Sequence, residues 1–224
     1  MIVTIDGPAG AGKSTVARSL AARLGCQFLD TGAMYRAVAL AAIRANIDWD
    51  DKQGLLRLAD GVQIRLDGKQ VLLDEEDVSQ DIRRPEIASV IHYVADHPGI
   101  RERLIGMQRA AVVGRSAVTE GRDQGTLAFP DAACKIFLTA SPQERAHRRQ
   151  LDLAERGQKV ALEQVLAQQQ ERDRRDRERE VGSLQRAPDA IEVITDGMSQ
   201  VEVVQHLVEI VRAAASDQDG PEGL

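Results

Sequence analysis

A glycine-rich loop between an apolar run and an amphipathic segment constrains this 224-residue chain more than any other feature. Residues 7–15 read GPAGAGKST and match the phosphate-loop pattern G-x-x-x-x-G-K-[ST]. Residues 1–5 are apolar and β-branched, as in a buried strand, and apolar residues recur at helical spacing from 16 to 24. A strand, a loop and a helix in this order form a cradle of backbone N–H groups that binds phosphate. The loop therefore predicts that the chain handles a nucleoside triphosphate.

The loop also predicts individual contacts. The Lys13 side chain would reach the β- and γ-phosphates, and the Ser14 hydroxyl would hold Mg²⁺. A glycine turn that precedes a lysine by chance is the alternative, and the flanking strand and helix argue against it. The predicted nucleotide-binding residues are Gly7, Pro8, Ala9, Gly10, Ala11, Gly12, Lys13, Ser14 and Thr15.

Composition narrows the class of protein. A hydrophobic content of 43% supports a packed core, and the length suits one α/β domain with a small insert. We find no stretch near the roughly 20 apolar residues of a membrane span and no secretory signal. The net charge of −6 gives no general attraction for nucleic acid. Cys26 and Cys134 each adjoin a predicted strand, which favours buried free thiols and a cytoplasmic location.

Predicted strands alternate with predicted helices along the chain. The strands lie at 1–5, 27–29, 116–119, 134–138 and 190–194, and the later helices at 33–45, 85–95, 100–113, 142–156, 161–180 and 199–214. This order predicts an α/β fold with a five-stranded, mostly parallel sheet flanked by helices, which binds ligands at the carboxyl ends of its strands. A hairpin at 62–73, around Asp67-Gly68, interrupts the alternation. We therefore expect a single domain over 1–215, an insert over about 60–85, and a frayed tail over 216–224.

The segment DTGAMYR at 30–36 follows the second predicted strand. Its hydroxyl at Thr31, ring at Tyr35 and guanidinium at Arg36 could together hold a base and a phosphate. Alternatively, Thr31 caps the helix, Tyr35 lies in the core and Arg36 is solvated. Taken alone, these residues favour the second interpretation.

The segment EGRD at 120–123 follows the third predicted strand. An acidic residue at this point, downstream of a phosphate loop, is typical of a water-mediated contact to Mg²⁺. Arg122 would then point across the same crevice. A surface turn is an equally good interpretation of these four residues alone.

The segment 171–180 contains five arginines and five acidic residues, so it is neutral and unsuited to binding nucleic acid. At about 100° per residue in a helix, Arg172, Asp176 and Arg179 share one face. That face could hold phosphate oxygens and a sugar hydroxyl. A solvated helix with ion pairs between residues four apart is the alternative.

Together these motifs closely resemble those of bacterial cytidylate kinases. The resemblance rests on the phosphate loop, DTGAMYR at 30–36, GRDxGT at 121–126 and RDxxDxxR at 172–179, and it extends from about residue 2 to 212. It implies a P-loop NTPase core with a β-containing insert that binds the nucleoside monophosphate, and a short lid over about 150–162. It also implies that ATP, with Mg²⁺, phosphorylates CMP or dCMP. A monomer that binds neither nucleic acid nor membrane is the implied state.

The resemblance assigns roles to individual residues. Lys13, Arg122 and Arg172 would stabilise the transferring phosphoryl group, and Arg145 and Arg149 would contact ATP. The predicted binding residues for the acceptor nucleotide are Thr31, Tyr35, Arg36, Arg101, Arg122, Asp123, Arg172, Asp176 and Arg179. One departure concerns His92, which stands where the family tends to carry a small hydroxyl residue near the cytosine. Discrimination between cytosine and uracil depends on that position.

Two other classes of protein remain as alternatives. The first is another kinase for a nucleoside monophosphate or small metabolite on the same core, which segments 30–36 and 172–179 argue against. The second is a GTP-dependent switch or an ATP-binding module without enzymatic activity. A GTPase should carry an Asn-Lys-x-Asp guanine-binding motif, which this sequence lacks. A panel of nucleotide acceptors separates these alternatives.

Overall fold

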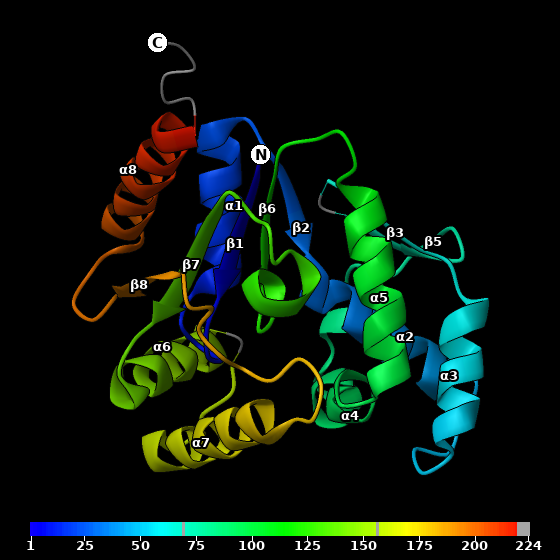
Figure 1. Ribbon diagram of the computed structural model, residues 1–224. Coiled ribbons are helices and arrows are strands. Elements are labelled where there is room, and N and C mark those ends of the chain that lie inside the picture. Colours follow the sequence, from blue (N-terminus) through cyan, green and yellow to red (C-terminus); the bar gives the residue numbers. More distant parts are fainter. Residues whose placement is uncertain (69, 156, 219–224) are drawn as a thin grey trace. The chain divides into compact units, whose positions relative to one another are not determined.

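The computed structural model describes residues 1–68, 70–155 and 157–218, which fall into two units (Figure 1). The first unit comprises Met1–Phe28 and the chain from Arg115 onward, and the second comprises Leu29–Gly114. The second unit is larger than the insert expected at 60–85. The division into one domain with a small insert stays a prediction.

A five-stranded sheet forms the centre of the first unit, in the order β2-β6-β1-β7-β8 (Figure 1). These strands are β1 (Ile2–Asp6), β2 (Gln27–Asp30), β6 (Ala117–Gly121), β7 (Cys134–Thr139) and β8 (Ile191–Ile194). The central strand β1 pairs in parallel with β6 and β7, so that Val3 lies opposite Val118 and Cys134. Strands β7 and β8 are also parallel. The α/β fold class predicted from the alternation is confirmed.

Helices α1 (Lys13–Leu24) and α8 (Gln200–Gln218) pack with one face of this sheet. Val3 and Ile5 of β1 meet Leu20 of α1 and Leu207 of α8 in a core where all four are fully buried. Because side chains alternate along a strand, Asp6 lies on the opposite face from Ile5. Helix α8 extends into the expected tail, of which residues 219–224 lie outside the described residues.

Two further helices of the first unit, α6 (Pro142–Glu155) and α7 (Leu162–Glu178), lie against each other (Figure 1). Their bounds agree closely with the predicted helices at 142–156 and 161–180. Across the connection between them, the Gln150 side chain donates a hydrogen bond to the Val160 carbonyl at 2.9 Å. The expected lid at 150–162 covers this connection, and its Arg156 lies outside the described residues.

The second unit is built around an alanine-rich helix, α2 (Thr31–Arg44), which is buried on most sides. It packs with three helices, α3 (Lys52–Gly61), α4 (Pro85–Ala95) and α5 (Pro98–Ala111). A separate antiparallel sheet consists of β3 (Ile64–Asp67), β4 (Gln70–Leu73) and β5 (Glu76–Asp77). The predicted hairpin corresponds to β3 and β4.

The sequence did not predict α3. The Asp51 carboxylate caps this helix by accepting from the Gly54 N–H at 2.8 Å. The helix residues Leu55 and Ala59 are buried. Glycines at 54 and 61 lower its intrinsic helix propensity, so tertiary packing stabilises it. In the part of the chain that the structure describes, we find no helix with the length and apolar character needed to cross a membrane.

Candidate functional site

The phosphate loop joins the carboxyl end of β1 to the start of α1 in the first unit. Gly7, Gly10 and Gly12 have positive φ angles of 149°, 79° and 85°, a region that favours glycine. A Cβ atom at Gly7 would also collide with the Leu138 carbonyl oxygen. The loop therefore has the curled backbone that an anion cradle requires.

Lys13 is the buried cation of this loop. Its side chain is almost fully enclosed, and its Nζ donates to the Pro8 carbonyl at 2.8 Å. Burial, together with the nearby positive charges of Arg122 and Arg172, lowers the pKa of Lys13 to about 7. Both arginines, which the sequence analysis also named, lie close enough to Lys13 to repel its charge. A bound polyanion would relieve that repulsion.

Ser14 and Glu120 bring a hydroxyl and a carboxylate together beside the loop. The Ser14 Oγ donates to the Glu120 Oε1 at 2.8 Å, although the two residues are 106 positions apart. Oxygen ligands of these two kinds suit Mg²⁺, which usually keeps several waters and takes the rest of its ligands from phosphates. Among the described residues we find no cluster of three His, Cys, Asp or Glu side chains that could hold a metal by itself. The pair fits a metal that arrives with a nucleotide.

The inner face of α7 collects arginines around one carboxylate. Asp176 accepts from the Arg122 Nε at 2.7 Å and from the Arg179 Nη2 at 2.6 Å. Burial alone would raise the pKa of Asp176, but Arg122, Arg172 and Arg179 together hold it well below its usual value. Asp176 is therefore ionised and orients two arginines that the sequence analysis assigned to phosphate.

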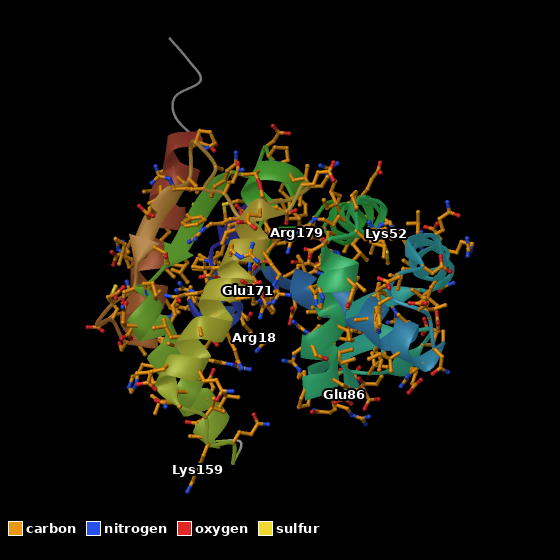
Figure 2. The ribbon with its side chains drawn as sticks, turned by 90° about the horizontal axis from the view of Figure 1, so that it is seen from below. Arg18, Lys52, Glu86, Lys159, Glu171 and Arg179 are labelled. Carbon is orange, nitrogen blue, oxygen red and sulfur yellow. The ribbon has the colours of Figure 1, made fainter. Side chains whose placement is uncertain are left out.

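The outer face of α7 is different. Arg174 forms ion pairs with Glu171 and Glu178, and the side chains of Arg174 and Glu171 are 56% and 49% exposed. In Figure 2, Glu171 lies within this helix and Arg179 directly follows its last residue. The solvated-helix interpretation thus describes this face, whereas the ligand-binding interpretation applies to the inner one.

Asp6, at the end of β1, is a residue that the sequence analysis missed. Its carboxylate accepts from the backbone N–H groups of Gln124 at 2.9 Å and Gly125 at 2.7 Å. These two residues begin a π-helical turn, Gln124–Ala128, directly after Arg122 and Asp123. Burial raises the pKa of Asp6 to about 7, against the opposing effect of the two N–H donors. An acidic residue at the carboxyl end of a buried strand is the signal that could have identified it.

Arg145 on α6 is held by backbone carbonyls and by a carboxylate. Its guanidinium donates to the Ala9 carbonyl at 2.8 Å and the Ala140 carbonyl at 3.1 Å, and it pairs with Asp173 at 2.7 Å. Arg145 and Asp173 are 4% and 2% exposed, so this ion pair is almost completely enclosed. The sequence analysis did not single out Asp173, and the contact between Arg145 and ATP stays a prediction.

The two neighbouring arginines of α6 differ in how many protein groups hold their guanidinium. Arg148 is held by the Glu144 carboxylate and by the hydroxyl and carbonyl of Thr195, at 2.7 to 2.9 Å. The half-buried Arg149 makes no hydrogen bond or ion pair with any residue in the described ranges. Its guanidinium is therefore the best placed of the three to bind a ligand.

In the second unit, Asp30 rather than Thr31 caps α2. The Asp30 carboxylate accepts from the Ala33 N–H at 2.9 Å and also binds the Arg36 guanidinium at 3.1 Å. Thr31 is the first helical residue and is buried. The alternative that Thr31 is the helix cap is therefore wrong. Arg36 is held at the start of α2, with its side chain 26% exposed.

Tyr35 and Arg101 also meet within the second unit. The Arg101 guanidinium carbon lies 5.2 Å from the centroid of the Tyr35 ring, and its Nη1 donates to the Ala95 carbonyl at 2.8 Å. His92, on the helix that ends at Ala95, packs against Tyr93 with 4.1 Å between ring centroids. Three of the acceptor residues predicted for this unit, Thr31, Tyr35 and Arg101, are thus buried or nearly so.

Comparison with known proteins agrees with the sequence motifs. The family model described as cytidylate kinase matches residues 3–213. A cytidylate kinase of Rhodopirellula baltica is 55% identical over 212 residues, which cover 95% of this chain and 93% of that protein. A bifunctional pantoate ligase/cytidylate kinase of Synechococcus sp. is 46% identical over 230 residues, covering 100% of this chain and 42% of that protein. A solved structure of an uncharacterized protein from Eubacterium ventriosum, 13% identical with a TM-score of 0.52, covers 95% of this chain and 98% of that one and shows the fold alone.

Proposed function

This chain belongs to the cytidylate kinase family, and on that premise we propose how its residues transfer the γ-phosphoryl group of ATP to CMP or dCMP. Phosphoryl transfer requires in-line placement of two polyanions and neutralisation of their charge, with little covalent chemistry by the protein. The observation that carries the proposal is the cluster of Lys13, Arg122 and Arg172, in which repulsion by the two arginines contributes to the lowered pKa of Lys13.

The donor is ATP. Backbone N–H groups of residues 10–15 and the Lys13 ammonium bind its phosphates, and Arg149 provides a further cation. Ser14 and Glu120 would hold Mg²⁺, Glu120 through water. When bound, Mg²⁺ would neutralise negative charge on the ATP phosphates during transfer.

The acceptor is a cytidine monophosphate. In the second unit, Arg36 is assigned to its phosphate, Arg101 to the cytosine edge, and Thr31 and Tyr35 to the lining of the binding site. These assignments extend the resemblance and are supported by the ordered positions of the four side chains.

In the first unit, Arg122 and Arg179 are assigned to phosphate oxygens, Asp123 to the cytosine, and Arg172 with Asp176 to the sugar hydroxyls. The hydrogen bonds from Arg122 and Arg179 to Asp176 support a shared task for these side chains. They hold their charges in place before the substrates arrive, which is how electrostatic stabilisation gains its strength.

The chemical step needs no general base. An anionic oxygen of the CMP phosphate attacks the γ-phosphorus, a new P–O bond forms, and the bond to the β–γ bridging oxygen breaks as ADP leaves. Lys13, Arg122 and Arg172 stabilise the negative charge on the migrating group. The products are CDP, or dCDP, and ADP.

We also propose that the protein works as a monomer in the cytoplasm on small-molecule substrates, with no nucleic acid or membrane partner. The free thiols of Cys26 and Cys134 agree with a reducing compartment. Burial raises the pKa of Cys134 to about 11, so this thiol is inert at neutral pH.

The test is ADP release from ATP and Mg²⁺ with CMP, dCMP, UMP, AMP and GMP offered separately. We expect rapid turnover with CMP and dCMP, little with the others, and none in a Lys13→Ala control. Turnover with UMP comparable to that with CMP would preserve the kinase assignment but require a different account of the base pocket around His92. No turnover with CMP or dCMP would contradict the proposed function.

A further inference from the structure

Arg145 and Asp173 form a buried ion pair that the proposed reaction does not use. The pair joins α6 to α7 at 2.7 Å, with side chains 5% and 3% exposed. Removing two charges from water is costly unless further hydrogen bonds satisfy them. The partners that satisfy this pair identify its task.

Both polar backbone groups of Ala9 are held by the pair. The Ala9 N–H donates to the Asp173 Oδ1 at 3.3 Å, and the Ala9 carbonyl accepts from the Arg145 Nη1 at 2.8 Å. The next peptide is planar and trans, so the Gly10 N–H points opposite to that carbonyl and away from Arg145. The ion pair thereby sets the direction of a donor in the phosphate loop.

The backbone of Gly10 lies directly against α6 and α7, and there is no room for a side chain at this position. A Cβ atom there would lie 2.5 Å from the Gln169 Nε2 and 3.3 Å from the Arg145 Cβ. Gln169 lies four residues before Asp173, on the same face of α7, and its Nε2 donates to the Arg145 carbonyl at 3.2 Å. The loop backbone at residues 9 and 10 is therefore packed directly against α6 and α7.

We propose that Arg145 and Asp173 are positioning residues that hold the first half of the phosphate loop in its phosphate-binding conformation. This role rests on the proposed function, because it requires that the loop bind ATP. It differs from the direct contact between Arg145 and ATP that the family resemblance implies. It also explains the placement of a carboxylate against an anion-binding loop, where its charge alone would repel phosphate.

The sign of the effect at Asp173 distinguishes these roles. Asp173→Asn removes a negative charge near the loop while nearly preserving the size of the side chain. Positioning predicts that the Kd for ATP·Mg²⁺ rises ~10- to 100-fold, the scale of a misplaced binding group. If Asp173 acted only through its charge, the same substitution would leave binding unchanged or make it tighter, and the proposal would be overturned.

The measurement is isothermal titration of ATP with Mg²⁺ in the absence of CMP. Because no acceptor is present, the result does not depend on which monophosphate the enzyme phosphorylates. Glu171→Gln is the matched control, since it removes a carboxylate from the exposed face of the same helix. We expect its Kd to equal that of the wild type.

A second variant separates positioning from folding. Arg145→Met combined with Asp173→Leu replaces the pair by apolar side chains of similar volume, a change that is often neutral or stabilising in a buried site. Because the Ala9 N–H and carbonyl also lose these partners, we expect a folded protein with a somewhat lower melting temperature, together with the weakened ATP binding. Wild-type affinity in this variant would overturn the proposal.

Hydrogen exchange provides a test in the unliganded protein. In Arg145→Met combined with Asp173→Leu, where residue 173 offers no acceptor to the Ala9 N–H, we expect faster exchange of the Ala9 amide, while amides in the core strand β1 keep their protection. Unchanged protection at Ala9 would contradict the assigned hydrogen bond, whatever the affinity for ATP.

Discussion

The end of β1 and the inner face of α7 each bury one carboxylate, and the two behave in opposite ways. Asp6 and Asp176 are 5% and 7% exposed. Burial raises the pKa of Asp6 to about 7, whereas for Asp176 the surrounding arginines overcome burial and lower the pKa. The Asp6 carboxylate accepts hydrogen bonds from neutral backbone N–H groups, whereas the Asp176 carboxylate accepts them from charged guanidinium groups. Burial raises the pKa of both acids, and the charge of the neighbouring groups decides whether the net shift is upward or downward.

The largest loss of activity is expected from removing Arg122, the partner of Asp176 that is assigned to the transferring phosphoryl group. Arg122→Ala removes both a partner of Asp176 and a cation beside Lys13. We expect kcat/KM to fall ~10²- to 10³-fold, about 3–4 kcal/mol of transition-state stabilisation. Steady-state kinetics with CMP and ATP test this, and Arg122→Lys controls for charge without the planar fork. A near-normal kcat/KM in Arg122→Ala would refute the role.

Asp176→Asn tests the arginine-paired carboxylate. It leaves Arg122 and Arg179 without their shared anion, so the free energy of unfolding should fall by about 3 kcal/mol at neutral pH. Because the folded-state pKa lies below the ordinary 3.8, the stabilising effect is fully present above about pH 4 and is lost as the pH falls through the folded pKa. Denaturant unfolding of both proteins between pH 3 and pH 7 measures this. Equal stability at neutral pH would show that the pairing contributes nothing.

Asp6→Asn tests the amide-paired carboxylate, for which the pH dependence has the opposite sign. Between the ordinary 3.8 and about 7, folded Asp6 retains a proton that the unfolded chain releases. Its contribution to stability is therefore greatest at low pH and declines as the pH rises to 7. We expect the stability of the wild type relative to Asp6→Asn to decrease by about 2 kcal/mol from about pH 5.5 to pH 8. A difference that does not vary with pH would contradict the raised pKa.

The smallest effect is expected on the outer face of α7. Glu171→Gln breaks an ion pair with Arg174 that is exposed to solvent on both sides. Exposed pairs of this kind contribute little, because water and salt screen them. We expect the melting temperature and kcat/KM to match those of the wild type in 0.15 M salt. A clear loss in either would mean that this face of the helix has a partner or a task beyond those considered.

Local patterns in the sequence predicted much of the fold. The phosphate loop, the alternation of strands and helices, and helix α4 at Pro85–Ala95 were all predicted where the structure has them. The division of α7 into two faces also followed from its periodicity. These features depend on residues near one another in the chain, so a short window of sequence is sufficient to recognise them.

The same patterns did not predict α3 or the cap of α2. Helix α3 contains two glycines and is stabilised by the burial of Leu55 and Ala59 against the rest of its unit. At α2, both Asp30 and Thr31 are good capping residues, and the structure uses the first. For α3 the deciding contacts lie outside the local window, whereas at α2 two adjacent residues suit the same role and the local pattern does not choose between them.

By itself, the sequence determined the family, the anion-binding loop and the set of arginines available for phosphate. Only the tertiary structure decided how the charged side chains are paired. Asp173 meets Ala9 across 164 positions of sequence, and Asp6 meets Gln124 across 118. Periodicity places an acid on a buried face but does not specify its partner, because that partner belongs to another element. The opposite pKa shifts of Asp6 and Asp176 depend on those long-range pairings, and so does the assignment of Arg145 to the loop backbone.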